Sequence, residues 1–315
     1  MSKRREFLKI SSLATGAMLL TKPLESVAGF SRRSGFLNRA LNEIEIFHSN
    51  DLHSKLTSNT DGLGGLDNIN LLLNKQSKSI VLDAGDFLDE NATLSEHIET
   101  IKAMNTAGYH AGTPGNHELA KGQEYLAALL PHMHFPLVNC NYLFSNEQLK
   151  QQVKPFTIVK FGRFKIGITG VGVQLDKNLR KKEKIICAHP YPKANAVAKM
   201  LKEQENCDLV ICLSHLGQSS IKGLPQNKEF ALSSAHIDLI IGGHGRSITA
   251  GPSIYHNEDG HEVIVSQTGW NGLIMRKLSI GYNYEGSRFS MNCRDYITGL
   301  HANDNFDEAF KSLTA

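Results

Sequence analysis

Side chains of metal-binding type follow five short segments of this sequence, each of which we expect to be a strand or a tight turn. In chain order they are Asp51 and His53 after residues 43–48, Asp86 and Asp89 after 79–84, Asn116 and His117 after the glycine-rich turn 111–115, His215 after 208–213, and His244 and Arg246 after 237–241. Carboxylate and amide oxygens together with imidazole nitrogens are ligands for Zn²⁺, Mn²⁺ or Fe. We therefore predict a site for two divalent cations about 3.5–4 Å apart, which would clamp an in-line displacement.

No single one of these motifs decides the interpretation. The chain holds 14 histidines, so an isolated Asp-x-His pair arises easily by chance, and His215 alone would be read as a structural histidine. Five motifs in this order, each after an expected strand or turn, are much harder to obtain by accident. Loops at the ends of buried strands are also where a rigid scaffold holds functional groups.

The elements that must position these groups mostly alternate between strand and helix in the first two thirds of the chain. Helices are expected at 63–76, 94–108 with Gly108 as C-cap, 193–205 and 305–313, and further strands at 137–140, 156–160, 164–169, 262–267 and 274–282. A hairpin is expected around a turn at Gly162. This order predicts a mixed α/β fold with sheets buried between helices.

The N-terminus differs in composition from the remainder of the chain. Residues 1–28 hold five basic and two acidic residues, while the remaining chain holds 29 of each, which argues against nucleic acid or a membrane surface as the binding partner. Adjacent Arg4 and Arg5 precede a short apolar stretch from Ile10 to Leu20. This resembles a twin-arginine export signal, so we expect a periplasmic protein without a stable membrane anchor once the signal is cleaved.

The motifs resemble those of the metallophosphoesterase (calcineurin-like) superfamily, and within it the catalytic domain of 5′-nucleotidases. They read FHSNDLHSKL, GGLDNIN, DAGDFLDE, AMNTAGYHAGTPGNHE, LVICLSHLG, IDLIIGGHGRS and VIVSQTGWNG. The resemblance implies a four-layer αββα sandwich. The expected segments are a signal peptide at 1–28, a lead-in at 29–42, a catalytic domain at 43–285, and a tail with a short helix at 286–315.

The resemblance also implies a role for each site residue. Asp51 and His53 would hold the first metal and Asp86 would bridge both, while Asn116, His215 and His244 would hold the second, with Asn116 also near the substrate phosphate. His117 would not be a ligand but would stabilise the transition state or protonate the leaving oxygen.

Three features depart from the nucleotidase pattern. Ala120 stands where an aspartate would orient His117, and we hypothesise that Asp89 takes over this task; the alternative is that Asp89 or Glu90 only caps the following helix. Arg246 stands where a metal ligand would be and could hold substrate phosphate instead, since a guanidinium offers no lone pair. The length also leaves no room for a second, nucleoside-selecting domain, so either the substrate is not a nucleotide or a separate chain supplies that domain.

The predicted activity is metal-dependent hydrolysis of phosphate monoesters, most simply 5′-nucleotides, with a role in nucleotide catabolism. Two alternatives stay open. One is a sulfate-ester or thiosulfate-type hydrolase on the same scaffold. The other is a catalytically impaired subunit that acts with a separate nucleotide-binding chain.

Overall fold

The computed structural model describes residues 42–217, 224–245, 247–283, 286–301 and 304–314. The predicted signal peptide, nearly all of the predicted lead-in, and Arg246 lie outside these residues. None of the described helices combines the length and the apolar character that a membrane crossing requires.

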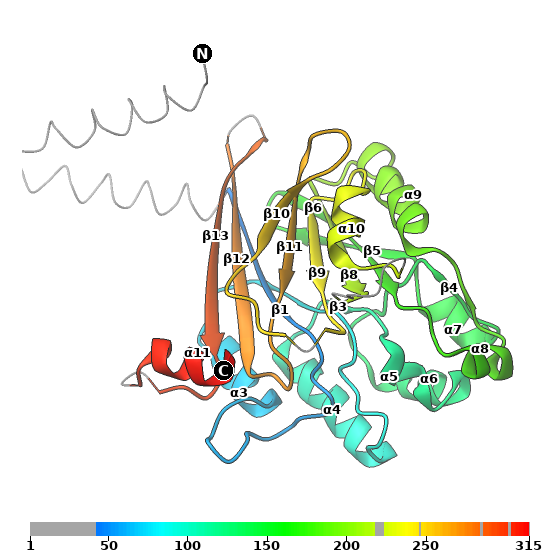
Figure 1. Ribbon diagram of the computed structural model, residues 1–315, viewed down its shortest axis with the longest axis horizontal. Helices are drawn as coiled ribbons and strands as arrows, with labels where there is room; N and C mark the ends of the chain where they lie inside the picture. The colour runs from blue at the N-terminus through cyan, green and yellow to red at the C-terminus, as the bar shows by residue number, and fades with distance from the viewer. Residues whose placement is uncertain (1–41, 218–223, 246, 284–285, 302–303, 315) are drawn as a thin grey trace, which may run out of the picture. The chain divides into compact units, whose positions relative to one another are not determined.

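Two sheets carry most of the strands (Figure 1). The first has the order β13-β12-β1-β2-β3 and the second the order β10-β11-β9-β8-β6-β5. The strands of the first sheet are β1 Glu43–Ser49, β2 Ile80–Asp83, β3 Ala111–Gly112, β12 Ile274–Tyr282 and β13 Arg288–Ile297. Those of the second are β5 Phe156–Phe161, β6 Phe164–Gly172, β8 Leu209–His215, β9 Leu239–Gly242, β10 Ser253–His256 and β11 Glu262–Gln267. A small third sheet pairs β4 Tyr142–Leu143 with β7 Ile186–Cys187.

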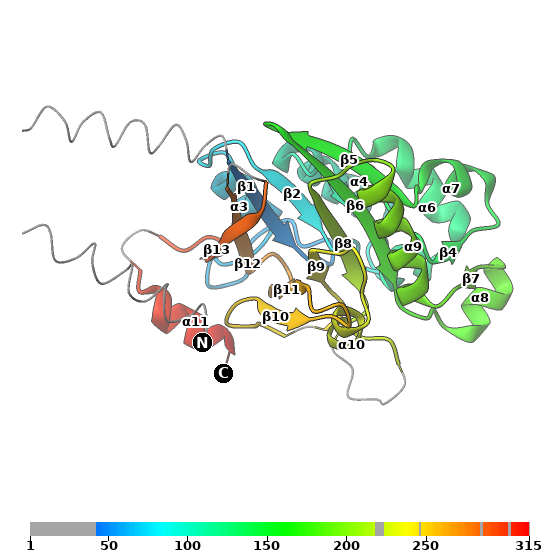
Figure 2. The same cartoon turned by 90° about the horizontal axis from the view of Figure 1, so that it is seen from above.

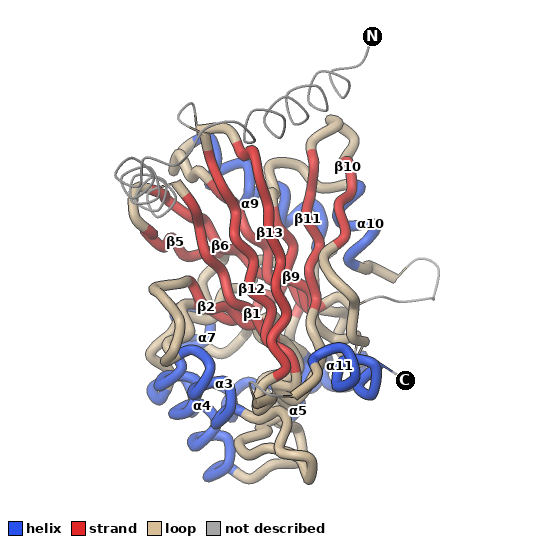
Figure 3. The backbone as a smooth tube through the Cα atoms, turned by 90° about the vertical axis from the view of Figure 1, so that its left-hand side faces the viewer, coloured by secondary structure: helices blue, strands red, loops and turns tan. Residues whose placement is uncertain are grey.

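Parallel pairing joins the strands from which the site loops emerge. β1, β2 and β3 are parallel neighbours in the first sheet, and β6, β8, β9 and β11 are parallel neighbours in the second. Antiparallel strands complete both sheets, and Figure 3 shows β13, β12 and β1 side by side. Because parallel strands end at the same edge of a sheet, the loops after β1, β2 and β3, and those after β8 and β9, are gathered there.

Helices cover the outer faces of the two sheets. They are α3 Leu66–Leu73, α4 Leu94–Ala107, α5 Asn116–Ala120, α6 Gln123–Leu129, η1 Leu130–His132, α7 Glu147–Gln152, α8 Lys177–Glu183, α9 Pro190–Glu203, α10 Asn227–Leu232 and α11 Phe306–Thr314. Side chains of α3 and α4 pack against the first sheet, and those of α9 and α10 against the second. In Figure 2, α9 lies alongside β6 and β8.

Alternation along the strands builds the layers between these helices. In β1, Ile44 and Ile46 face the core between the two sheets, while Phe47 faces α3 and α4. In β8, Ile211 belongs to the core between the sheets and Val210 to the core beneath α9 and α10. The four-layer αββα sandwich and the mixed α/β class expected from the sequence are thus confirmed.

Several local expectations differ from the structure. Residues 137–140 form only isolated bridges, because Leu137 and Val138 each contact a neighbouring segment through a single pairing. The stretch 286–315 was expected to be a tail with a helix, but it also contains β13, which extends the first sheet through its pairing with β12. Exposed residues interrupt the apolar pattern of β13, and this hides an edge strand from sequence reasoning. The expected C-cap is confirmed, since Gly108 ends α4 at φ 73°.

Candidate metal centre

The site loops bring together four of the predicted ligands and His117, which the resemblance implies is not a ligand. Ligand atoms of His53, Asp86 and His117 lie within 4.8 Å of one another, and so do those of Asp86, His215 and His244. Asp86 belongs to both groups. It follows β2, which lies between β1 and β3 in the first sheet. This shared carboxylate is the geometry that a bridging ligand requires.

Asp51 contacts a histidine of each group. Its Oδ1 is 3.9 Å from His53 Nε2, and its Oδ2 accepts the backbone N–H of His244 at 3.0 Å. The loop after β1 is thereby joined to the loop after β9, although 193 residues separate Asp51 from His244. The structure thus brings the predicted ligands of the first and second metal together through backbone contacts as well as side chains.

The backbone of these loops adopts a conformation that most residues avoid. Nine non-glycine residues of the described chain have a positive φ, and six of them lie in the site loops. These six are Asp51, His53, Ser54, Asp86, His244 and Asn271, with φ between 46° and 69°. Such backbone costs on the order of 1–3 kcal/mol per residue, and it persists only where the surroundings impose it. Its concentration here is independent support for a functional site.

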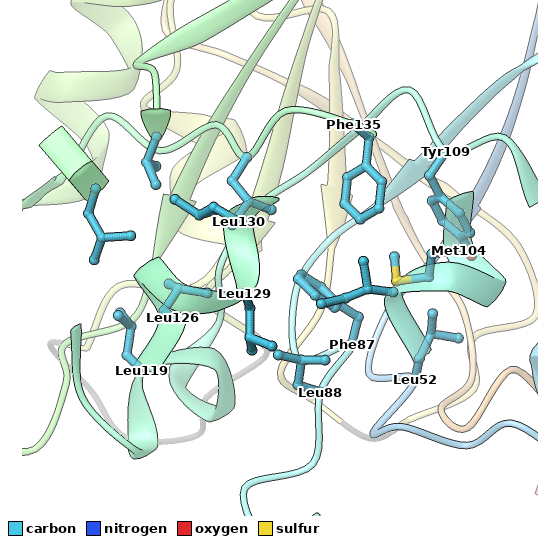
Figure 4. Packing of buried hydrophobic residues seen from close by; sticks show 14 of the residues in the cluster. Leu52, Phe87, Leu88, Met104, Tyr109, Leu119, Leu126, Leu129, Leu130 and Phe135 are labelled. Atoms are coloured by element: carbon cyan, nitrogen blue, oxygen red, sulfur yellow. The ribbon is translucent and has the colours of Figure 1, made fainter. Parts of the chain in front are cut away.

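Apolar side chains within the same loops anchor them to the core (Figure 4). Leu52 lies between Asp51 and His53, and it is fully buried. Phe87 follows Asp86 and is likewise buried in the cluster with Leu52. In these loops a buried apolar residue therefore stands next to each metal-binding residue in the sequence. Its packing fixes the position of the metal-binding side chain and stabilises the backbone with positive φ.

Glu118 holds the loop after β2 against the start of α5. Its Oε2 accepts the backbone N–H groups of Asp86 at 3.0 Å and Gly115 at 2.7 Å, and its Oε1 accepts that of Leu88 at 2.8 Å. Burial and the neighbouring Asp86 charge raise the pKa of the Glu118 carboxyl to about 8, while the backbone donors favour its ionised form. The glutamate of the GNHE motif is therefore a positioning residue.

Gly115 is required by the close approach of two predicted ligands. A Cβ at this position would overlap Asp86 Oδ1 and would lie 2.7 Å from His215 Nε2. Its φ of −88° is open to any residue, so space rather than backbone conformation demands the glycine.

The electrostatics around His215 fit a bound cation. His215 Nδ1 donates to the backbone carbonyl of Ala84 at 2.8 Å, so the neutral ring presents the Nε2 lone pair to Asp86 Oδ2 at 3.0 Å. Burial alone would lower the pKa of His215, but the Asp86 carboxylate outweighs it and raises this pKa to about 10. Two facing acceptors require a proton or a cation between them.

Asn116 points to the same chemistry. Its Oδ1 is buried and has no hydrogen-bond partner among the residues that the structure describes. A buried carbonyl oxygen without a donor costs about 1–3 kcal/mol, which a hard cation at this place would offset. The donor set of oxygens and imidazoles therefore fits the two divalent cations that the sequence predicts.

His117 lies at the edge of this centre. Its Nε2 is 3.7 Å from Asp86 Oδ2, and its Nδ1 accepts the backbone N–H of Glu90 at 3.4 Å. With Nδ1 as the acceptor, the neutral ring carries its proton on Nε2, on the side of the site.

The structure does not bring the Asp89 carboxylate to His117. Asp89 Oδ1 accepts the backbone N–H of Asn91 at 2.9 Å, and within the described part of the chain no hydrogen bond joins the two side chains. Both nevertheless line one cavity of about 430 Å³, together with His53. The helix-capping alternative is wrong as well, because Thr93 caps α4.

Two further positioning residues were missed from the sequence. Asn50 donates from Nδ2 to Asp51 Oδ2 at 2.7 Å, and its Oδ1 accepts the backbone N–H of Thr268 at 2.9 Å. Asn271 Oδ1 is 3.4 Å from His53 Nδ1. Both asparagines lie in motifs that were noted, but no spacing rule links residue 50 or 53 to a partner 218 residues away.

The comparison with protein families agrees with this geometry. The sequence profile of the calcineurin-like phosphoesterases matches residues 44–245, a range that includes all the predicted ligands. The chain belongs to this family. The resemblance noted from the motifs is thereby confirmed, and a family that works with two metals agrees with the two groups around Asp86.

The curated relatives of this calcineurin-like phosphoesterase include a nucleotide phosphoesterase and a nucleotidase. The chain is 26% identical over 279 residues to the trifunctional nucleotide phosphoesterase protein YfkN of Bacillus subtilis. This alignment covers 78% of this chain and 18% of YfkN. The chain is 28% identical over 280 residues to the NAD 5′-nucleotidase of Haemophilus influenzae. This alignment covers 78% of this chain and 45% of the nucleotidase. The chain thus spans less than half the length of either relative.

Solved structures share the fold. The 5′-nucleotidase precursor of Thermus thermophilus matches with a TM-score of 0.70 at 21% identity, covering 86% of this chain and 58% of that one. The NAD nucleotidase of Haemophilus influenzae matches with a TM-score of 0.69 at 24% identity, covering 86% of this chain and 61% of that one. The sulfate thiohydrolase SoxB of Thermus thermophilus matches with a TM-score of 0.63 at 13% identity, covering 86% of this chain and 59% of that one. At these identities the likeness shows the fold alone.

Proposed function

We propose that this calcineurin-like phosphoesterase uses two divalent cations to hydrolyse phosphate monoesters, with nucleoside 5′-monophosphates as the substrate class. The observation that carries the proposal is the position of Asp86 in both groups of potential ligands. The nucleotide-cleaving activity of the curated relatives supports the choice of substrate class.

The residues of the chain divide the work between holding the cations and stabilising the leaving group. Asp51, His53 and Asp86 would hold one cation, and Asp86, Asn116, His215 and His244 the other. Bound there, the cations supply Lewis-acid stabilisation of the charge on the transferring phosphoryl group. Their identity is proposed only as a choice among Zn²⁺, Mn²⁺ and Fe, which accept these oxygen and nitrogen donors.

His117 completes the reaction. The oxygen of a water forms the new bond to phosphorus, the ester P–O bond breaks, and a proton of that water passes to the leaving alcohol. The Nε2–H of His117 stabilises the charge that develops on the leaving oxygen by donating a hydrogen bond to it. The backbone N–H of Glu90 favours this tautomer, since it occupies Nδ1. Arg246 remains a proposed phosphate contact outside the described residues.

The test is phosphate release from 5′-AMP by the full chain with Mn²⁺ or Zn²⁺. We expect release that chelator abolishes, that His117→Ala lowers by about 10²–10⁴-fold, and that exposed His134→Ala leaves unchanged. About two equivalents of transition metal should accompany the active protein. No metal bound, or release unaffected by His117→Ala, would refute the proposal.

Neither alternative from the sequence is preferred. The sulfur-ester alternative has one structural neighbour in its favour, and at 13% identity that neighbour supports the fold alone. An impaired subunit is expected to have lost ligand groups, whereas both groups around Asp86 are present. Nothing in the comparisons supports a separate nucleotide-binding chain, and the proposed reaction requires none.

We also propose export through the twin-arginine route and a periplasmic location, on the basis of Arg4 and Arg5 and the apolar stretch that follows them. Replacing both arginines by lysine should keep the protein in the cytoplasmic fraction of its host. Unchanged appearance in the periplasmic fraction would contradict this route.

A further inference from the structure

A cavity of about 710 Å³ opens beside the candidate metal centre. Two predicted metal ligands, Asn116 and His244, line one end of it, and Ala120 lines it nearby. The remaining wall comes from residues 172–176 after β6, from α8, and from the segments that precede α9 and α10. The cavity is therefore continuous with the site, but most of its lining has no part in the proposed chemistry.

This wall is fixed by specific hydrogen bonds. Asn141 accepts the backbone N–H of Gly172 at 2.8 Å, and its amide donates to the carbonyls of Gly172 at 3.0 Å and Ala188 at 3.2 Å. Tyr142 donates from its hydroxyl to the carbonyl of Val173 at 2.7 Å. Two segments that line the cavity are thus joined through one buried asparagine, which gives a preformed rather than a collapsible pocket.

The lining suits an organic group more than a second phosphate. Leu175, Leu179, Pro190 and Leu216 contribute apolar surface, and polar side chains such as Asn116, Gln174 and His244 line the same cavity. Pockets of roughly 300–1,000 Å³ with such mixed walls accept drug-sized ligands, whereas a phosphoryl group alone fills a small part of that space. The short side chain of Ala120 takes little room where the cavity meets the metal centre.

The charge around the cavity is mixed. Glu90 and Asp176 line it, while the helix that carries Leu179, α8, exposes Lys177, Lys181 and Lys182 beside it. The apolar lining, and not charge, therefore favours an organic leaving group.

We propose that this cavity holds the leaving group of the ester, and that it selects a nucleoside-sized, partly apolar group over a bare sugar. The inference rests on the proposed phosphoesterase function, and it places the selecting surface within this chain. The scissile phosphate would lie at the Asn116 and His244 end, with the nucleoside extending toward Leu175 and Leu179.

The experiment compares 5′-AMP with ribose 5-phosphate, which has the same phosphate and sugar but no base. With the full chain and Mn²⁺, we expect kcat/KM for 5′-AMP to exceed that for ribose 5-phosphate by about tenfold or more. Leu179→Trp, which fills the cavity, should remove this preference mainly by raising KM for 5′-AMP. Exposed Leu232→Trp on α10 is the matched control, and it should leave kcat/KM for both esters unchanged.

A second measurement does not depend on how the variants fold. Adenosine should competitively inhibit the hydrolysis of ribose 5-phosphate by the unmodified chain, and ribose should not. Equal kcat/KM for both esters without inhibition by adenosine would overturn the cavity assignment while leaving the phosphoesterase function intact. An equal effect of Leu179→Trp on both esters would overturn it too. Failure to hydrolyse either ester with metal bound would remove the proposed function itself.

Discussion

Glu118 accepts the backbone N–H of Asp86 at 3.0 Å, so the carboxylate of one motif fixes the main chain of another. Asp86 is the residue shared by both groups of potential metal ligands. The buried Glu118 carboxyl accepts three backbone N–H groups. These bonds hold the main chain of the loop after β2, and they do so independently of what the side chains of that loop bind.

Replacement of Glu118 by glutamine should therefore destabilise the protein. The new NH₂ group must face a backbone N–H, which leaves a buried donor without an acceptor and costs about 1–3 kcal/mol of unfolding free energy. Urea unfolding in chelator, at a pH above the pKa of about 8 that burial gives Glu118, compares the variant with the ionised carboxylate and apart from metal binding. Exposed Glu99→Gln on α4 is the control, and equal stability of the two variants would refute the positioning role.

The extent to which sequence predicted this site has a physical basis. Asp86, His117 and His215 could be predicted because each follows a recognisable strand or turn, and parallel strands bring their ends together. Glu118 was visible in the motif, but its three acceptor contacts depend on how two loops fold against each other. The positive φ of Asp51 and His244 could not be predicted either, because the two residues lie in loops that meet only in the fold, where the His244 N–H donates to Asp51 Oδ2.

Asp83 should make stability depend on pH. It is fully buried, and Ser49 donates to its Oδ2 at 2.6 Å. Burial raises its pKa from 3.8 to about 7, against the lowering effect of the Ser49 hydrogen bond. Because the folded pKa lies above the unfolded one, the native state binds this proton more tightly. Its contribution is complete below about pH 4 and is lost as pH rises through 7.

The predicted loss is roughly 4 kcal/mol at its upper limit. In chelator, Asp83→Asn should flatten the fall in unfolding free energy between about pH 4 and 8 relative to the unmodified protein. Exposed Asp61→Asn should leave that fall in place. Parallel pH profiles for Asp83→Asn and the unmodified chain would contradict the assignment.

Asn271 should affect metal affinity through His53. Its Oδ1 lies 3.4 Å from His53 Nδ1, and its own φ is 54°. Asn271→Gly removes the carboxamide but tolerates this backbone, so we expect metal binding to weaken by about 10–100-fold with little loss of stability. Asn271→Ala should add a stability loss of about 1 kcal/mol or more from the left-handed backbone. Calorimetric metal titration of both variants checks this, and unchanged affinity in Asn271→Gly would count against it.

Replacement of Asp89 should have little effect on the reaction, because its carboxylate accepts the backbone N–H of Asn91 at 2.9 Å and does not bind His117. If the Glu90 amide rather than Asp89 sets the tautomer of His117, Asp89→Asn removes no group that is bound to His117. The variant should then keep kcat for 5′-AMP within about twofold and leave its pH profile in place. Ala120→Asp is the informative partner variant, since it restores a carboxylate at the position where nucleotidases have one. A pH profile displaced by Asp89→Asn alone would reinstate the dyad expected from the sequence. A profile displaced only by Ala120→Asp would show that this chain orients His117 without a carboxylate.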